Sequence, residues 1–408
     1  MKLVKSHNRN FRWVVLSVAT VAQATACFFV QGLGALAGYM QEALRLNAFE
    51  IGLLVSAAQL FPVIGLLLAG ELLDRFNERL IVGVGSLIIA ASLFSSSYAT
   101  NYRELLGWLF IVGIGYSTAQ PGGSKSVSGW FSKSQRGFAM GIRQAGLPLG
   151  GALAAGSLPL VAANYGWRAA FLVGSGVAFI GGVLFIIVYR PPIVNTHNRR
   201  AVSIKTALHN RLSLLKHPSM RNILWSGITL ITAQYGIVIF LVLYMHDRFN
   251  VSFENSANIL FVTQCAGVVG RIALAAWSDR SKHGRYFPIL TSMGALILGF
   301  IMLLILWTKS LVILFILAAW LGFFGFGWYG PWVAYVSELA PPERTGFALG
   351  LAMAINQVAV IVSPPLLGWL RDITGSYVTA WSLLIVILIT SILMTRPRKK
   401  LRMGSNEQ

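Results

Sequence analysis

The sequence predicts an all-α membrane protein with twelve transmembrane helices, arranged as two pseudo-symmetric six-helix bundles. Hydrophobic residues make up 56% of the 408 residues and charged residues only 11%, whereas soluble domains average about 25% charged residues. The apolar residues form long blocks, and two short motifs recur about half the chain apart. This composition argues against an ordinary soluble enzyme and excludes an intrinsically disordered chain.

Twelve apolar blocks account for the predicted helices, because a helix needs about 20 mostly apolar residues to cross the hydrocarbon core. The first block is too long for the apolar part of a signal peptide, about 7–15 residues, so we expect no cleavable signal. In chain order the blocks span 13–39, 51–73, 80–99, 104–124, 138–162, 168–189, 222–245, 256–277, 287–307, 310–335, 346–370 and 377–395.

Basic residues predict the orientation of these helices, because Lys and Arg in short loops stay on the cytoplasmic side. We therefore expect a multi-pass protein of the cell inner (plasma) membrane, with both termini cytoplasmic. The net charge of +20 then reflects topology, and no nucleic-acid partner is expected, since that class needs a basic patch with exposed aromatic residues. Of the 33 basic residues, those that would lie on the opposite side are Arg45, Arg103, Arg168, Arg248, Lys309 and Arg371.

The longest polar stretch, residues 190–221, divides the blocks into two sets of six. We interpret it as a basic cytoplasmic linker, which could include a helix lying on anionic headgroups. The predicted domains are therefore an N-terminal six-helix bundle in residues 1–189, this linker, a C-terminal six-helix bundle in residues 222–395, and a basic cytoplasmic tail in residues 396–408.

Internal repetition supports the division into halves. The pair Asp74-Arg75 after the second block recurs as Asp279-Arg280 after the eighth block. A Gly-Phe-Ala-x-Gly motif starts at residue 137 after the fourth block and at residue 346 after the tenth. Duplicated halves are common in transporters, which bind substrate at the interface between the repeats.

The loop after the second block carries a resemblance to a known family. Segment 70–79 reads Gly-x-x-x-Asp-Arg-x-x-x-Arg, and a degraded copy starts with Ser-Asp-Arg at residue 278. This pattern resembles the signature loop of the major facilitator superfamily, and with the twelve blocks and the central loop the resemblance covers nearly the whole chain. It implies transport by alternating access between two six-helix halves.

The resemblance also implies gating residues at the cytoplasmic ends of the helices. A carboxylate there can accept hydrogen bonds from a neighbouring helix N-terminus and pair with arginine. The alternative is that these residues only shape the turn and the topology. The expected gating residues are Asp74, Arg75, Arg79, Asp279 and Arg280.

Arg143 is the strongest candidate for binding substrate. It lies about 10 Å beyond Arg136 along a helix that rises 1.5 Å per residue, where a charge costs about 3 kcal/mol or more unless it faces a wet cavity or a partner. Its counterpart in the second half is Ala352, so the repeat does not require it. The guanidinium suits a carboxylate or oxoanion; the alternative is snorkelling to the headgroups. Segment 143–151, Arg-Gln-Ala-Gly-x-Pro-x-Gly-Gly, also resembles helix five of cyanate- and nitrate-type facilitators.

Two other cations lie in or beside apolar blocks. Lys125 follows a Pro-Gly-Gly segment that could open the helix to a cavity, although it is close enough to the surface to snorkel. We include it among the predicted substrate-binding residues. Arg271 precedes Asp279, and we interpret it as a structural part of the second loop region.

Neutral polar residues complete the predicted site. Unsatisfied amides in hydrocarbon cost several kcal/mol, so they should face a wet cavity or another helix. The same residues could instead act as contacts between helices. In the family, helices one, four, five, seven, ten and eleven line the cavity, and the resemblance therefore selects Gln120, Gln144, Gln234, Tyr235 and Gln357 beside Arg143.

Several chemical signatures are missing. None of the 13 acidic residues lies in the middle of an apolar block, which argues against a cationic-drug pump with a buried carboxylate. Glu71, Glu104 and Glu338, near helix ends, are the candidate proton carriers. The chain has no Cys/His cluster and no GxxxxGK[ST] loop, so we expect no metal, no cofactor and no enzyme activity.

The sequence thus favours a secondary active transporter that moves a small anionic or zwitterionic metabolite, such as an organic acid or amino acid, by proton-coupled uptake. Its expected partners are that substrate, protons as coupling ion and the lipid bilayer, and we expect a monomer. Two alternatives remain open. One is an exporter of a metabolite, drug or siderophore, and the other is a non-transporting sensor or scaffold on the same fold.

Overall fold

The computed structural model describes residues 10–75, 77–131, 135–191, 218–282, 284–306, 310–339 and 345–395. In these ranges the chain is helical, with short connecting turns and no strand. Most of the predicted linker, residues 190–221, and all of the predicted tail, residues 396–408, lie outside the described residues.

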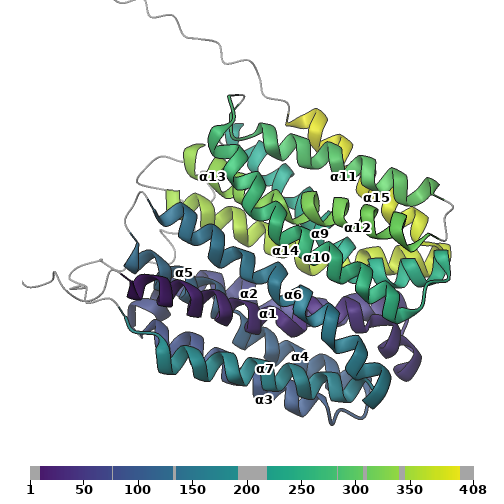
Figure 1. Ribbon diagram of the computed structural model, residues 1–408, viewed down its shortest axis with the longest axis horizontal. Coiled ribbons are helices and arrows are strands. Elements are labelled where there is room, and N and C mark those ends of the chain that lie inside the picture. The colour runs from purple at the N-terminus through teal and green to yellow at the C-terminus, as the bar shows by residue number, and fades with distance from the viewer. Residues whose placement is uncertain are drawn as a thin grey trace, which may run out of the picture.

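The helices form two groups that pack against each other (Figure 1). The first group, purple to teal, comprises α1 (Phe11–Leu44), α2 (Ala48–Arg75), α3 (Glu78–Ser96), α4 (Tyr102–Tyr116), α5 (Ala119–Trp130), α6 (Arg136–Tyr165) and α7 (Trp167–Val188). The second group, green to yellow, comprises α9 (Pro218–Phe249), α10 (Phe253–Arg280), α11 (Phe287–Ile305), α12 (Leu311–Gly327), α13 (Tyr329–Leu339), α14 (Thr345–Thr374) and α15 (Tyr377–Met394).

The predicted twelve crossings are confirmed, and two of them are each divided into two helices. Within the described residues, eleven helical segments are long and apolar enough to span a membrane, and the α12–α13 pair counts as one of them. The fourth block forms α4 and α5, which are too short singly and make the twelfth crossing together. Successive crossings run in opposite directions. We call the side that holds Asn10 and Thr395 the termini face, and the side that holds Arg45 and Gly375 the distal face.

A proline accompanies each of the two divisions. A residue that continues a helix donates its N–H to the carbonyl four residues earlier, and proline has no N–H to donate. Pro121 therefore cannot bond Ser117, and Pro331 cannot bond Gly327. The chain breaks between α4 and α5 and again at Trp328 between α12 and α13. Both prolines then lie in the first turn of the new helix, where the missing N–H costs little.

The helix pairs show a two-fold relation between the halves. In the first half α1 packs on α6, α2 on α4, and α3 on α7. In the second half the corresponding pairs are α9 with α14, α10 with α12, and α11 with α15. The halves meet through α2 with α14, α6 with α10, and α1 with α9, and this set maps onto itself when the halves are exchanged. The predicted fold of two pseudo-symmetric six-helix bundles is therefore confirmed.

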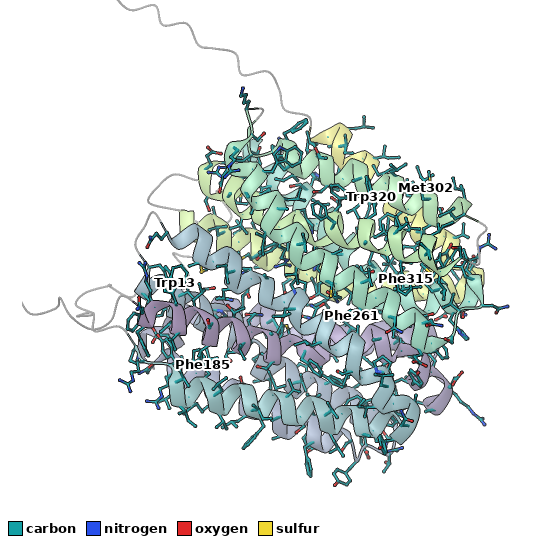
Figure 2. The ribbon with its side chains drawn as sticks, viewed as in Figure 1. Trp13, Phe185, Phe261, Met302, Phe315 and Trp320 are labelled. Carbon is teal, nitrogen blue, oxygen red and sulfur yellow. The ribbon has the colours of Figure 1, made fainter. Side chains whose placement is uncertain are left out.

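The outer surface of the bundle is apolar. Large hydrophobic side chains are exposed along the helices, among them Trp320 and Phe261, which are labelled in Figure 2. Val312 and Ile316 on α12 are 67% and 66% exposed. Water-soluble monomers rarely expose apolar surface on this scale, so lipid is the solvent of these helices.

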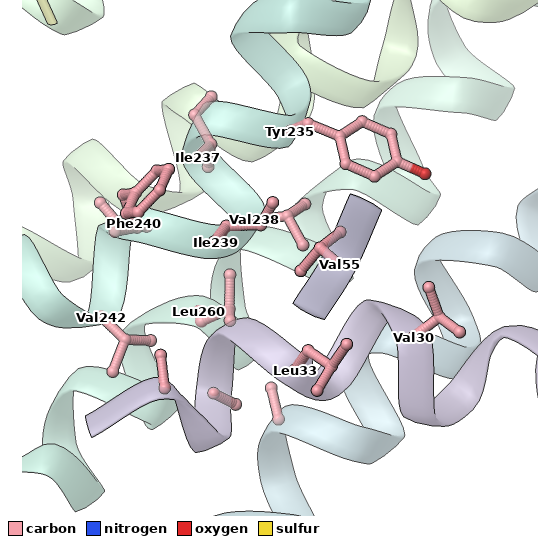
Figure 3. Close-up of a cluster of buried hydrophobic side chains, with 14 of the residues drawn as sticks. Val30, Leu33, Val55, Tyr235, Ile237, Val238, Ile239, Phe240, Val242 and Leu260 are labelled. Carbon is pink, nitrogen blue, oxygen red and sulfur yellow. The ribbon is translucent and has the colours of Figure 1, made fainter. Parts of the chain in front are cut away.

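Apolar packing closes the distal half of the interface between the two groups. Figure 3 shows Leu33 of α1, Val55 of α2 and Val238 of α9 gathered in one cluster. Gly34 permits this approach, because a Cβ there would collide with the backbone carbonyl of Val238. On the same side of the molecule, a Cβ at Gly52 of α2 would collide with the α14 backbone.

Candidate functional site

A cavity of about 100 Å³ lies between the two halves at the mid-depth of the bundle. Helices of both groups form its wall, and the α4–α5 and α12–α13 breaks both contribute residues. The wall consists of Gln59, Pro62, Tyr116, Ser117, Gln120, Gln144, Leu147, Ile231, Gln234, Tyr235, Arg271, Tyr329, Met353, Asn356, Gln357 and Val360.

Arg271 of α10 is the charged residue of this wall. It is 5% exposed, and its Nη1 donates to the Gln144 carbonyl of α6 at 2.9 Å. Its guanidinium lies over the Tyr329 ring, 4.9 Å from the centroid, and its Nε has no hydrogen-bond partner among the described residues. A fixed positive charge with an unused donor therefore borders the cavity.

Arg143 of α6 lies behind this wall. It is fully buried, and its guanidinium donates to Gln23 Oε1 of α1 at 3.0 Å, to the Gln120 carbonyl at 2.7 Å and to Ser124 Oγ at 2.9 Å. Gly123 leaves room for the guanidinium, because a Cβ there would lie 3.3 Å from Arg143 Cζ. In this conformation Arg143 thus reaches the cavity through Gln120 of α5, which lines it.

Five residues predicted to bind substrate do line the cavity: Gln120, Gln144, Gln234, Tyr235 and Gln357. The wall also contains Gln59 and Asn356, which the sequence did not single out for this role. Asn356 is 5% exposed, and neither polar atom of its side chain has a hydrogen-bond partner among the described residues.

A hydrogen-bond network crosses between the halves on the distal side of the cavity. The Tyr235 hydroxyl of α9 accepts from Gln31 Nε2 at 3.4 Å and from Gln59 Nε2 at 3.1 Å. Gln357 Nε2 of α14 donates to Gln59 Oε1 at 2.8 Å. Tyr235 lies at the edge of the apolar cluster in Figure 3, with its hydroxyl directed away from Phe240. These four side chains join α1, α2, α9 and α14.

Lys125 lies apart from the cavity wall. Its Nζ is 3.2 Å from Glu78 Oε1. This contact joins α5 to the start of α3 near the termini face. Glu78 is 8% exposed, and a buried carboxylate is stable as a charge only when it has partners. The structure thus places Lys125 in an ion pair between helices.

The predicted gating residues occupy the termini face. Asp74 and Arg75 lie in the last turn of α2, and their side chains are outside the described residues. Arg79 donates its Nε–H to the Ile186 carbonyl of α7. Asp279 pairs with Arg285 at 2.5 Å, and Arg280 is exposed.

Arg285 also joins two helices of the second half. Its Nε lies 3.4 Å from Glu338 Oε2 at the end of α13, while its Nη1 contacts Asp279 at the end of α10. The side chains of Asp279 and Glu338 are more than half exposed. Surface pairs of this kind contribute little energy singly, so they can break and re-form as the helix ends move.

A second set of polar contacts closes the distal face. The Asp372 carboxylate of α14 accepts from the backbone N–H of Ala48 at 3.1 Å and of Phe49 at 2.9 Å. It therefore caps the N-terminus of α2 across the two halves. Arg371 pairs with Asp372 at 3.4 Å and with Asp247 of α9 at 3.1 Å.

Sequence reasoning missed three features of this region. Arg271 could have been found by the depth argument used for Arg143, because it lies about 12 Å along the helix from Asp279 at 1.5 Å per residue. Asn356 is adjacent to Gln357 and carries no separate signal. Asp372 lies at a helix end among loop residues, where only the folded chain shows that it contacts α2.

Comparisons with known proteins agree with this architecture. The sequence model described as Major Facilitator Superfamily matches residues 19–364 and 282–407. The hexuronate transporter of Bacillus subtilis is 24% identical, with 85% of each chain covered. Monocarboxylate transporter 2 of Mus musculus is 25% identical over 90% of this chain and 79% of that protein. An MFS-type transporter of Mycobacterium tuberculosis is 27% identical over 91% and 82%.

Solved structures show the same fold. The nucleoside transporter NupG superposes with a TM-score of 0.74 at 15% identity, with 95% of this chain and 100% of that chain covered. A bacterial homologue of the human lysosomal transporter Spinster, in an inward-facing and occupied conformation, gives a TM-score of 0.70 at 15% identity, with 95% of each chain covered.

Proposed function

The chain belongs to the major facilitator superfamily, and from this membership we propose that it carries a small organic anion through the central cavity by alternating access. The relatives and structural neighbours are transporters rather than enzymes. The chain is a multi-pass membrane protein. Proton-coupled uptake across an inner (plasma) membrane, with both termini cytoplasmic, is part of the proposal.

The observation that carries the proposal is Arg271 in the cavity wall. A buried guanidinium without a countercharge is costly, and no acidic side chain is part of the described wall. A carboxylate can supply the missing charge and two hydrogen bonds, because it matches the planar fork of arginine. The cavity therefore favours anions over neutral or cationic compounds.

The relatives support the same chemical class. Besides the hexuronate and monocarboxylate transporters, they include a probable galactarate/D-glucarate transporter of Bacillus subtilis, 23% identical over 90% of this chain and 88% of that protein. Each of these names describes an organic acid. We propose an organic acid as the cargo of this chain too.

Arg143 has a supporting part in this proposal. The sequence suggested that it binds the anion directly. Its bonds to Gln23, Gln120 and Ser124 favour a different role in this conformation, in which Arg143 fixes the Gln120 wall and adds positive potential behind it. Direct contact with Arg143 would need rearrangement of α5.

Access alternates by rocking of the halves. The close contacts between the halves lie in the distal half and at mid-depth of the described bundle, which supports a conformation closed at the distal face. With the proposed orientation, the cavity communicates with the cytoplasm. We propose that Asp74, Arg75, Arg79, Asp279 and Arg280 lock the termini face in the opposite conformation.

The test is transport by the full-length protein in liposomes. A panel of labelled solutes would include D-glucuronate, propionate, an uncharged hexose and a cationic amine, with and without an inward proton gradient. We expect flux of at least one acid, driven by the gradient and reduced at least tenfold in Arg271→Gln. The matched control is Arg103→Gln, which removes an exposed arginine of α4.

Other results would contradict the proposal. Transport of only the amine or the hexose would exclude an anion site. Binding of an acid without any flux would favour the sensor, and acid efflux that exceeds uptake under every gradient would favour the exporter.

A further inference from the structure

The cavity wall is unusually rich in side-chain amides. Six of the residues that line it are Gln or Asn, and they come from five helices: Gln59, Gln120, Gln144, Gln234, Asn356 and Gln357. Amides both donate and accept hydrogen bonds. Beside the single described charge of Arg271, the wall therefore offers a neutral, two-way hydrogen-bonding surface.

Several of these amides keep bonding capacity for a ligand. Neither polar atom of Asn356 is paired with a described residue, although the residue is 95% buried. Gln234 Oε1 accepts from the Trp328 indole at 3.2 Å, and this bond orients the amide and leaves its NH₂ as a donor. Gln357 donates to Gln59, which leaves the Gln357 oxygen as an acceptor.

Among the described residues, Asn356 is positioned by packing contacts rather than by side-chain hydrogen bonds. A Cβ at Gly227 of α9 would lie 2.9 Å from Asn356 Nδ2, so the absence of a side chain at Gly227 provides the space for the amide. A buried amide without partners is destabilising. This position therefore gains from a ligand that supplies both an acceptor and a donor.

A hydroxyl group meets this requirement. Each hydroxyl donates one hydrogen bond and accepts up to two, as the Asn356 amide needs. An aliphatic chain at the same place would leave the amide unpaired, and sites built for a hydroxyl discriminate strongly against analogues that lack it. The cavity of about 100 Å³ suits a compact ligand.

We propose that the cargo is a compact hydroxylated carboxylate, a hydroxy acid or sugar acid, with its carboxylate at Arg271 and its hydroxyl groups at Asn356 and Gln234. The inference rests on the proposed function, since it assigns the uncharged part of the same anion. It excludes a plain aliphatic acid as the preferred substrate.

The experiment compares acids of equal charge and chain length. Binding to the purified full-length protein is measured by ligand-dependent thermal stabilisation, which follows the free ligand concentration relative to Kd. The matched pairs are lactate with propionate, glycerate with propionate, and gluconate with hexanoate. We expect the hydroxylated member of at least one pair to bind tenfold more tightly or better.

Variants assign this preference to the wall. In Asn356→Leu the ratio of affinities within the pair should fall toward one, chiefly through weaker binding of the hydroxylated acid. In Arg271→Gln both members should lose affinity. The control Asn164→Leu replaces an exposed asparagine near the distal end of α6 and should leave the ratio unchanged. If Asn356→Leu does not fold, Gln234→Met removes a neighbouring amide at constant length and should lower the same ratio.

The possible outcomes separate the two proposals. If the wild type binds both members of every pair equally and Arg271→Gln loses both, the amide inference is wrong and the anion proposal stands. If no acid binds while an uncharged compound does, the anion proposal itself fails. A preference for hydroxylated acids that survives both Asn356→Leu and Gln234→Met would also overturn the assignment.

Discussion

Arg143 and Arg271 are the two buried arginines of the described residues, and their guanidinium groups are used differently. Arg143 donates to three side chains or carbonyls of α1 and α5. Among the described residues Arg271 has one such bond, to the Gln144 carbonyl, and its guanidinium lies over the Tyr329 ring in the cavity wall. Both arginines thus join helices, but among the described residues Arg271 uses fewer of its N–H groups than Arg143 and is the one that lines the cavity.

This difference predicts distinct phenotypes for the two arginines. Arg143→Gln removes the donor for several buried acceptors, which should cost about 3 kcal/mol and lower the apparent Tm by roughly 5 °C. Arg271→Gln should change the Tm less but reduce acid affinity at least tenfold. Thermal unfolding in detergent, with and without glycerate, measures both effects. If Arg143→Gln keeps the wild-type Tm and loses only binding, Arg143 itself anchors the anion, as the sequence suggested.

Tyr235 tests the network on the distal side of the cavity. Tyr235→Phe removes the oxygen that accepts from Gln31 and Gln59, and each buried donor left unpaired costs about 1–3 kcal/mol. Because this network joins the halves, the distal-closed conformation should lose population. The expected readout is a longer distance between spin labels at Arg103 and Val378, which lie near the distal face on opposite halves. An unchanged distance distribution would show that the network does not hold the face closed.

At the residue scale, the sequence could predict that buried amides line the cavity. It could not predict that both members of an adjacent pair do so. The cost of burying polar groups, together with the family resemblance, selected five residues that line the cavity. Asn356 and Gln357 follow each other on α14, and only packing against Gly227 and Gln59 shows that both line the cavity. Arg271 was assigned to the loop region because Asp279-Arg280 repeats an earlier pair, and this repetition concealed its depth.

At the element scale, the contact between α3 and α5 predicts a structural role for Lys125. Lys125→Met would leave Glu78 without this partner near the end of α3. Because the Lys125 side chain is 36% exposed, we expect a cost of about 1 kcal/mol, below the 3–5 kcal/mol typical of fully buried pairs. The apparent Tm should fall slightly, with acid affinity unchanged. The double variant Lys125→Met with Glu78→Gln should recover stability. A tenfold loss of acid affinity in Lys125→Met would instead support the substrate-binding role that the sequence suggested.

The helices themselves were largely predictable, because length and apolar content decide membrane crossings. The twelve blocks correspond to the observed crossings, although α1, α2 and α9 extend beyond their blocks by several residues. The two divided crossings were not predicted. The sequence indicated that Pro121 loosens its helix. The equivalent position of Pro331 in the second half was not noticed. The two breaks form a related pair, which becomes clear when the halves are compared.

At the scale of the whole molecule, α2 and α14 form an antiparallel pair across the interface. The α2 N-terminus and the α14 C-terminus meet at the distal face, where Asp372 caps α2. At the termini face the same two helices present their other ends, the last turn of α2 with Asp74 and the first turn of α14 after Thr345. Exchanging the halves maps the α2–α14 pair onto the α10–α6 pair, so the repeat does not relate the distal end of α2–α14 to its end at the termini face. These two ends are related by the antiparallel packing of α2 on α14.

This relation predicts that Asp372 and Asp74 act in opposite conformations. A carboxylate at a helix N-terminus contributes about 0.5–2 kcal/mol. Asp372→Ala should therefore weaken the distal-closed conformation, and Asp74→Asn should weaken the conformation closed at the termini face. Spin labels at Arg103 and Val378 should report a larger distal separation in Asp372→Ala and a smaller mean separation in Asp74→Asn.

Both variants should slow transport several-fold, because alternating access needs both conformations to be populated. Acid affinity should stay within about the same several-fold factor, since Asp372 is not part of the described cavity wall and Asp74 lies in the last turn of α2. If the two variants move the label distances in the same direction, the helix ends do not act as opposed latches, and Asp74 would then be a turn residue as the simpler interpretation of the loop holds.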